Sequence, residues 1–238
     1  MATDGPLDKP LISILPDRAA LMEAAALRIV DIGRQAIAQR GHFAWALAGG
    51  STPRALYELL GSGRFIDKLD WQCVQFFWSD ERCVAPDHED SNYGMARAAL
   101  LDRLPLTAAQ VHRMQGEAPP EAAARAYELQ LRAAAPLDLV LLGMGADGHT
   151  ASLFPHSPAL SETQRWVVPS SSPTGTQRLT FTFTAINQAR AVLLLVAGRD
   201  KAERVKQALQ EPNAELPVQR VRGHIEWMLD QQAAGELS

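Results

Sequence analysis

Short apolar segments alternate with helical segments along most of the chain, and this alternation constrains the fold more than any other feature. The segments predicted to be strands are residues 43–48, 73–78, 137–143, 178–183 and 191–196. The segments predicted to be helices are residues 17–40, 53–60, 91–103, 119–134 and 200–210. Several of the strands are apolar on both faces, as strands covered by helices on each side must be. The sequence therefore predicts an α/β fold in which parallel strands are joined by crossover helices.

The length of the chain sets the number of domains that it can form. Its 238 residues, 47% of them hydrophobic, are enough for one large or two small domains. The densest cluster of turn residues, at 169–177, is short enough to be a surface loop rather than a linker. We therefore expect one domain over residues 1–238, with two smaller domains as the alternative.

Composition excludes several classes of protein. A formal net charge of −4 argues against nucleic acid as a partner, since such proteins usually carry a basic stripe. Cys73 and Cys83 are the only cysteines, too few for a disulfide framework or a cysteine zinc site. The first ten residues lack the pattern of a signal peptide, and the apolar runs are too short to span a membrane. We expect a cytoplasmic protein.

The loops that follow the strands are the expected place for a ligand, because ligands of open parallel sheets bind beyond the carboxyl ends of the strands. After residues 43–48 come Gly49, Gly50, Ser51 and Thr52, with Thr52 predicted as a helix cap and Pro53 as the first helical residue. The glycines allow close approach of a ligand, and the helix start offers free amides, which suits a phosphate. A capped turn without a ligand is the alternative.

Charged residues follow two other strands. Asp80 and Arg82 come directly after residues 73–78, where they could present a carboxylate and a guanidinium to a polar substrate or form a surface ion pair. Lys201 lies in the first turn of a predicted helix, against the helix dipole, which an anion held there would explain. Arg178, at the head of a predicted strand, is a similar candidate. A solvated side chain is the alternative for both.

The loop after residues 137–143 contains the pattern Gly143-x-Gly145-x-x-Gly148, the glycine spacing of a dinucleotide-binding turn. A ribose-binding carboxylate is expected about twenty residues further on, and none occurs there. Asp147 would also bring a negative charge to the pyrophosphate. The same turn instead lets Asp147 and His149 reach the cleft, where a histidine can act as a general base and a carboxylate can fix its tautomer. A histidine that caps a short helix near Thr150 is the alternative. The spacing of the histidines does not favour a metal.

Several motifs in order along the chain resemble the 6-phosphogluconolactonase family, which is shared with glucosamine-6-phosphate deaminase. They are "ALAGGSTPRALYELL" (46–60), "FFWSDERCVAPDHEDSNYGMARAALLDRL" (76–104), "LDLVLLGMGADGHTASLFP" (137–155) and "LLLVAGRDKAERV" (193–205). The resemblance extends to about residue 229. It implies a three-layer α/β/α fold with a mostly parallel central sheet. It also implies hydrolysis of a phosphorylated sugar lactone to 6-phosphogluconate, in the pentose phosphate pathway and without a cofactor.

The resemblance also implies roles for the loop residues. Gly49 through Thr52, together with Arg178 and Lys201, would hold the 6-phosphate of the substrate. His149 would activate the water molecule that attacks the lactone carbonyl, and Asp147 would orient it. Arg82, beside Asp80, would stabilise the developing oxyanion or hold ring hydroxyls. No metal and no partner chain is implied, and we expect a monomer or a weak homodimer.

Two other functions remain as alternatives. The deaminase branch resembles Asp-Glu-Tyr where this chain has Asp80, Glu81 and Arg82, and it carries a glutamate where this chain has Phe154. Both positions favour the lactonase over a deaminase or isomerase. A regulatory module that binds sugar phosphates without catalysis would be expected to carry a DNA-binding helix-turn-helix, for which the region before residue 17 has no room.

Overall fold

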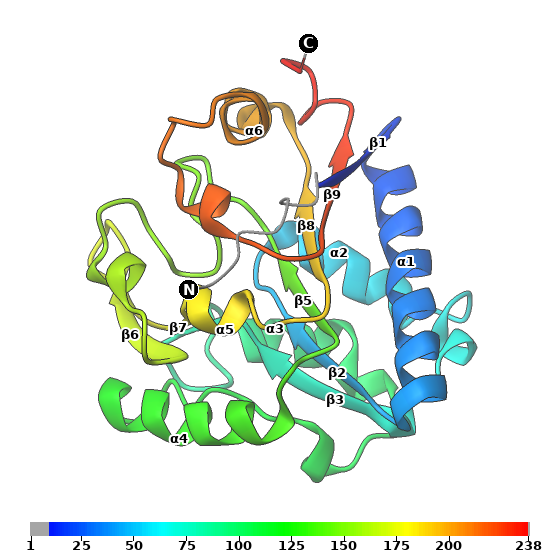
Figure 1. Cartoon of the computed structure of the whole chain (residues 1–238). Coiled ribbons are helices and arrows are strands. Elements are labelled where there is room, and N and C mark those ends of the chain that lie inside the picture. Colours follow the sequence, from blue (N-terminus) through cyan, green and yellow to red (C-terminus); the bar gives the residue numbers. More distant parts are fainter. Residues whose placement is uncertain (1–9, 238) are drawn as a thin grey trace.

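A six-stranded parallel sheet forms the centre of the protein in the computed structural model, which describes residues 10–237. Its strands lie in the order β1, β9, β8, β5, β2, β3, and all neighbours are parallel (Figure 1). Their bounds are Leu11–Leu15 for β1, Phe43–Leu47 for β2, Val74–Trp78 for β3, Leu139–Leu142 for β5, Val192–Val196 for β8 and Ile225–Asp230 for β9. Strands β2, β5 and β8 are buried throughout, as their apolar sequences predict.

Helices cover both faces of this sheet, and the alternation of side chains along each strand divides the core into two halves. Phe43, Trp45 and Leu47 of β2 pack with helices α1, α2 and α3. Ala44 and Ala46 face the other side, with α4, α5 and α6. The helices are α1 Arg18–Arg40, α2 Ser51–Leu60, α3 Asn92–Ala99, α4 Pro120–Ala134, α5 Phe183–Ile186 and α6 Ala202–Gln210. The three-layer α/β/α fold is therefore confirmed.

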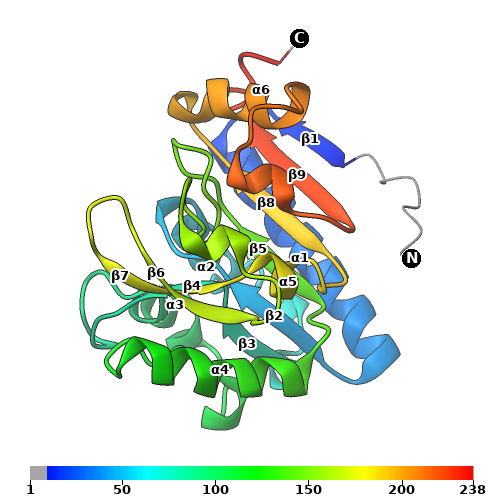
Figure 2. The same ribbon diagram turned by 60° about the vertical axis from the view of Figure 1, so that its left-hand side comes forward.

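A second, antiparallel sheet lies beside the first, in the order β4, β7, β6 (Figure 2). Its strands are β4 Asp80–Arg82, β6 Val167–Ser171 and β7 Gln177–Phe181. The strand predicted at 178–183 is β7, so its assignment to a parallel sheet was wrong. It also ends earlier than expected, because the chain turns after Phe181 into α5. Leu179 and Phe181 face the core between the two sheets, which explains their alternation with polar residues.

The sequence pattern did not reveal the strands at one edge of the central sheet. Strand β1 is largely exposed, and β9 is half-buried at its start, so neither shows an uninterrupted apolar run. Their pairing with each other joins the two ends of the chain. Helix α1 confirms its prediction closely: the Asp17 side chain accepts a hydrogen bond from the Ala20 amide, and Gly41 ends the helix in the left-handed region.

Other helix boundaries differ from the predictions. Helix α2 begins at Ser51 with Gly50 as its cap, so the prediction that Thr52 caps the helix was wrong. Gly50 has a φ of 101°, which favours glycine and lets the chain turn one residue earlier than expected. Two predicted helices are partly 3₁₀. The short 3₁₀ segments are Ile66–Lys68, Trp71–Cys73, Leu101–Arg103, Ala108–Gln110, Pro158–Ser161, Arg199–Lys201 and Pro217–Arg220.

Two buried tyrosines fix the carboxyl ends of β2 and β3. The Tyr57 hydroxyl of α2 accepts from the Ala48 amide and donates to the Ala48 carbonyl, both at 2.9 Å. The Tyr127 hydroxyl of α4 accepts from the Trp78 amide at 2.8 Å and donates to its carbonyl at 3.3 Å. Burial raises the pKa of both phenols, so they remain neutral donors. The loops that leave these strands therefore start from fixed positions.

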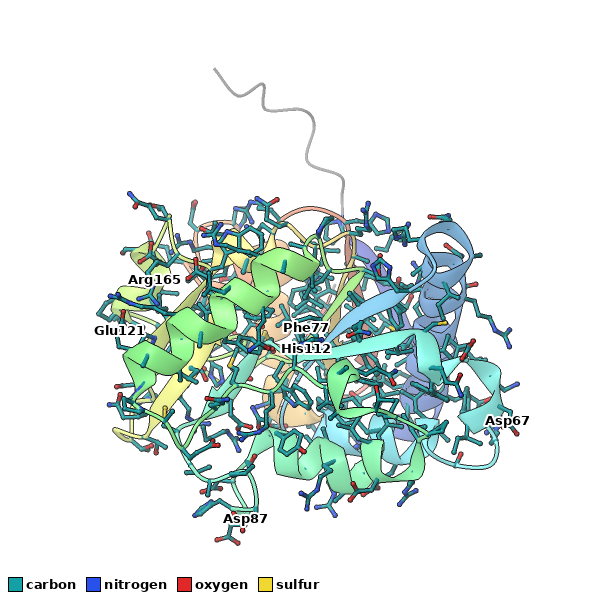
Figure 3. All side chains as sticks on the ribbon, turned by 90° about the horizontal axis from the view of Figure 1, so that it is seen from below. Asp67, Phe77, Asp87, His112, Glu121 and Arg165 are labelled. Carbon is teal, nitrogen blue, oxygen red and sulfur yellow. The ribbon has the colours of Figure 1, made fainter. Side chains whose placement is uncertain are left out.

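Side-chain contacts also cover the side of the molecule formed by β3 and α4, which Figure 3 shows from below. His112 stacks on Phe77 of β3 with ring centroids 4.5 Å apart. Arg165 donates to Glu121 of α4 at 2.7 Å, which ties that helix to the segment before β6. No helix within residues 10–237 is both long and apolar enough to cross a membrane.

Candidate functional site

A cleft of about 610 Å³ lies at the carboxyl edge of the central sheet. The loops after β2, β3, β5 and β8 contribute to its walls, and β7 of the small sheet completes them. All ten residues predicted for the site line this cleft: Gly49, Gly50, Ser51, Thr52, Asp80, Arg82, Asp147, His149, Arg178 and Lys201. The parallel arrangement therefore brings together side chains from five separate segments, as expected for an open sheet.

His149 and Asp147 form a hydrogen-bonded pair in the loop after β5. The Nδ1 atom of His149 lies 2.6 Å from Oδ1 of Asp147, which also accepts the His149 amide at 3.1 Å. Partial burial alone would raise the pKa of the Asp147 carboxyl, but these contacts with His149 outweigh it and hold that pKa below its usual range. The ionised carboxylate keeps the imidazole proton on Nδ1, so Nε2 is the nitrogen that can accept a proton.

Gly145 makes room for this pair. A Cβ atom at Gly145 would lie 2.1 Å from His149 Nδ1 and 2.8 Å from Asp147 Oδ1. The Gly145 amide also donates to the His149 carbonyl at 2.8 Å, which closes the turn. The absence of a side chain at Gly145 therefore allows the close approach of two side chains from its own loop, His149 and Asp147. His149 does not cap a helix, since the residues after it form turns.

Phe154 packs against the imidazole. The two ring centroids are 4.5 Å apart, with an angle of 48° between the planes. Phe154 is 7% exposed and lines the cleft. The hydrogen bond to Asp147 and the contact with Phe154 together limit the rotation of the His149 ring.

Asp80 is almost fully buried, at 8% exposure, and both of its carboxylate oxygens accept hydrogen bonds. Ser152 Oγ donates to Oδ2 at 2.7 Å, and Asn92 Nδ2 lies 3.2 Å from Oδ1. Sequence reasoning missed Asn92 and assigned no role to Ser152, although both lie within the family-like motifs. Neither residue lies in a local sequence pattern that by itself would identify it as part of the site. Within residues 10–237, no group of three or more acidic, histidine or cysteine side chains is placed to hold a metal ion.

Arg82 and Arg178 lie opposite each other on the neighbouring strands β4 and β7. Arg82 donates to the Asp90 carbonyl, but the Nε atoms of both arginines are buried without a hydrogen-bond partner. Burial and the nearby charge of Arg82 lower the pKa of Arg178. Among the described residues no ion pair joins either arginine to an acid, so the expected alternative of a surface ion pair at Asp80 and Arg82 was wrong. Two unpaired guanidinium groups favour an anionic or strongly polar ligand.

Gly50 and Lys201 line the cleft from the loops after β2 and β8. Gly50 caps α2 with no side-chain hydrogen bond, so the first amides of this ten-residue helix are not used by a capping side chain. Lys201 is partly buried and its Nζ lies 3.2 Å from Asp200. The turn before it is held by buried Asp230, whose carboxylate accepts the Gly198 amide at 3.1 Å. These features provide amides and a cation for an anionic group.

Known proteins resemble this chain over nearly its full length. A family profile described as glucosamine-6-phosphate isomerases/6-phosphogluconolactonase matches residues 16–229. A 6-phosphogluconolactonase from Nostoc sp. is 40% identical, and the match covers 97% of this chain and 99% of the relative. The corresponding values for a 6-phosphogluconolactonase from Synechocystis sp. are 39%, 96% and 98%.

Solved structures agree with these matches. The structure of 6-phosphogluconolactonase from Trypanosoma brucei has a TM-score of 0.86 and 33% identity, and covers 97% of this chain and 99% of its own. A monomeric glucosamine-6-phosphate deaminase has a TM-score of 0.83 at 22% identity, with coverage of 95% and 99%. The second likeness shows the fold alone.

The packing of Gly145 generates a direct test of the histidine pair. We expect Gly145→Ala to push the imidazole away from Asp147, because the added methyl would overlap Nδ1. The downfield proton resonance of the hydrogen-bonded Nδ1–H, measured by NMR, should then disappear or move strongly. Gly143→Ala is the matched control, since the nearest atom to a Cβ there is 4.0 Å away. An unchanged resonance in the Gly145 variant would contradict the observed packing.

Proposed function

The chain belongs to the family of glucosamine-6-phosphate isomerases and 6-phosphogluconolactonases, and on this premise we propose that it hydrolyses 6-phospho-D-glucono-1,5-lactone to 6-phospho-D-gluconate. This reaction is a step of the oxidative pentose phosphate pathway. The observation that carries the proposal is the His149–Asp147 pair, which lies in a cleft also lined by Arg82, Arg178 and Lys201. A general base among cations suits hydrolysis of an anionic lactone.

Two contacts favour the lactonase over the deaminase. Phe154, where the deaminase resemblance would place a glutamate, packs its ring against His149 and supplies no acid or base. Arg82, where a tyrosine would stand, brings a permanent positive charge next to Arg178. Opening an aminosugar ring needs additional proton transfer, whereas lactone hydrolysis needs one base and a stabilised oxyanion.

In the proposed mechanism, Nε2 of His149 removes a proton from water as its oxygen bonds to the lactone carbonyl carbon. Asp147 stabilises the imidazolium that forms, through the 2.6 Å hydrogen bond. The guanidinium of Arg82 stabilises the negative charge on the former carbonyl oxygen. As that oxygen reforms a double bond, the bond to the ring oxygen breaks, and the imidazolium returns its proton to the ring oxygen. The product is the open-chain carboxylic acid, which then ionises.

The phosphate of the substrate has a separate binding region in this proposal. Amides and hydroxyls of residues 49–52 at the start of α2, together with Lys201 and Arg178, hold its oxygens. Local cations and amides therefore bind an anion on a protein whose formal net charge is −4. Asp80 has further acceptor capacity on its held carboxylate and binds a ring hydroxyl.

We also propose how the protein works as a whole. One domain over residues 1–238 carries the reaction, with no cofactor, metal, nucleic acid or second subunit in the mechanism. A cytoplasmic location is supported by the free thiols of Cys73 and Cys83, because reducing compartments preserve such thiols.

The proposed activity is tested with two substrates. We expect rapid acid release from fresh 6-phosphogluconolactone, above the spontaneous rate, and no ammonia from glucosamine 6-phosphate at the same enzyme concentration. A pH-stat follows the first reaction and a coupled ammonia assay the second. Stoichiometric ammonia would favour the deaminase, and binding of both compounds without turnover would favour a regulatory module.

Removal of the base should abolish most of the catalysis. His149→Ala is expected to lower kcat by about 10²–10⁴-fold, the usual contribution of a general base, while 6-phosphogluconate still binds in calorimetry. Asp147→Asn should lose less, since it disturbs the imidazole without removing it. Near wild-type turnover by His149→Ala, after subtraction of the spontaneous rate, would exclude His149 as the base.

The pH dependence gives a second measurement of the same group. The wild-type kcat/KM should fall toward acid pH, because a protonated imidazole cannot accept a proton. Asp147 should remain ionised over this range, since its pKa lies below its usual value. An acid limb that persists unchanged in His149→Ala would assign the titration to another group.

Lys201 should act on substrate binding. Lys201→Ala is expected to lower kcat/KM about ten- to hundredfold, mainly through KM, because a charge-assisted hydrogen bond contributes roughly 1.5–3 kcal/mol. Lys206→Ala, in the helix α6 that follows Lys201 but outside the cleft, is the control and should leave the kinetics unchanged. Equal kinetics for the two variants would remove Lys201 from the phosphate site.

A further inference from the structure

Asn92 is a buried side chain of the cleft to which neither the sequence nor the proposed mechanism assigns a role. It is the first residue of α3 and is 2% exposed. Its Nδ2 donates to the Asp80 carbonyl at 2.9 Å and lies 3.2 Å from the Asp80 carboxylate oxygen Oδ1. One amide group therefore holds both the backbone and the side chain of Asp80.

Asn92 is itself held rigidly by Glu81. The backbone amide of Asn92 donates to Glu81 Oε1 at 2.7 Å, and the backbone amide of Tyr93 donates to Oε2 at 2.8 Å. The Ser91 hydroxyl and the Arg82 amide complete the partners of this carboxylate, at 3.1 and 2.7 Å. Burial raises the pKa of Glu81, which at 2% exposure is sealed from solvent. The start of α3 is thereby locked to β4.

Gly49 leaves the space that Asn92 fills. A Cβ atom at Gly49 would lie 2.0 Å from Asn92 Oδ1 and 2.4 Å from its Cγ. Any residue other than glycine at position 49 would overlap the Asn92 side chain in the position from which it contacts Asp80. The amide side chain therefore lies between the glycine turn of residues 49–52 and the Asp80 carboxylate.

The second oxygen of Asp80 is held from the opposite wall of the cleft. Ser152 Oγ donates to it at 2.7 Å, and Ser152 belongs to the loop that carries His149. The Ser152 amide donates in turn to Thr180 of β7, at 3.1 Å. Asn92, Asp80 and Ser152 thus form a continuous chain from the glycine turn to the His149 loop.

We propose that Asn92 is a positioning residue for the reaction: it orients the Asp80 carboxylate and, through it, sets the spacing between the phosphate-binding turn and the His149 loop. This inference rests on the proposed lactonase function. In that function Asp80 binds the substrate directly, and Asn92 affects the substrate only by orienting Asp80. Without the Nδ2 donor, the Asp80 carboxylate group can turn about its Cβ–Cγ bond. Its free lone pairs are then no longer fixed in the direction needed to accept a hydrogen bond from the substrate.

A double-mutant cycle tests this coupling. Asn92→Ala should lower kcat/KM and weaken 6-phosphogluconate binding, each about ten- to hundredfold, as expected for a lost hydrogen bond to a charged group. In an Asp80→Asn background the same substitution should change either quantity less than threefold, because its effect is transmitted by the carboxylate. Effects that multiply in the double variant would overturn the proposal.

Ser91→Ala is the matched control. It removes the cap that Ser91 Oγ provides to the Gly94 amide at 3.0 Å and one of the four hydrogen bonds to Glu81, but it leaves both contacts of Asn92 Nδ2 with Asp80 in place. It should lower the Tm while kcat/KM changes less than threefold. A loss of kcat/KM equal to that of Asn92→Ala would mean that α3 stability alone explains the effect.

Asn92→Asp is a second variant of nearly the same size. It replaces the Nδ2 donor, which holds the Asp80 carbonyl and carboxylate, by a carboxylate oxygen that only accepts hydrogen bonds. It should lower kcat/KM at least as much as Asn92→Ala, and a wild-type kcat/KM in this variant would contradict the proposal. An inactive wild type would refute the lactonase function instead, in which case the cycle on 6-phosphogluconate binding decides the role of Asn92.

Discussion

The parallel direction of all six central strands is the constraint on which the rest of the structure depends. It places the carboxyl ends of β2, β3, β5 and β8 at one edge, where their loops share a single cleft. Burial on both faces enforces this arrangement, since each inner strand presents apolar side chains to two separate cores. Tyr57 and Tyr127 then fix the ends of β2 and β3 from opposite faces. Chemistry from distant parts of the sequence is thus gathered on a rigid base.

Two glycines of this cleft leave room for polar side chains of the protein itself. Gly49 and Gly145 have in common that a polar side chain occupies the space where their Cβ would be. At Gly145 the occupants are His149 and Asp147, and at Gly49 it is Asn92. The glycines of two conspicuous motifs therefore shape the site by admitting its own side chains, in addition to any approach by a ligand. This explains why a glycine spacing typical of dinucleotide sites can occur in a loop that presents a histidine.

The sequence predicted most of the parallel core, because buried strands and amphipathic helices each leave a local pattern. Strands β1 and β9 were not predicted, because they lie at the edge of the sheet, where exposed positions interrupt their apolar runs. The small sheet was misjudged for different reasons: β7 is apolar on one side alone, its partner β4 is far away in the sequence, and residues 169–171 of its other partner β6 were expected to belong to a surface loop. The cap of α2 was wrongly assigned to Thr52 because the φ of Gly50 is not visible in a sequence.

The candidate site also contains residues that could be predicted from the sequence and residues that could not. Residues placed directly after strands could be found, since the parallel fold determines where such loops meet. Asn92 could not, and neither could the contact of Ser152 with Asp80, because a buried polar side chain is recognised by partners that only the folded structure brings to it. The contact between Phe154 and His149 likewise depends on a turn whose shape the sequence does not reveal.

We propose that one ligand contacts all these loops at the carboxyl edge of the sheet. Amide chemical shifts measured by NMR during titration with 6-phosphogluconate test it most directly. We expect large shifts in residues 49–52, 80–82, 145–149 and 198–201, with little change near Gly41 and His112, which lie outside the cleft. Shifts concentrated elsewhere, or in one of these loops alone, would contradict it.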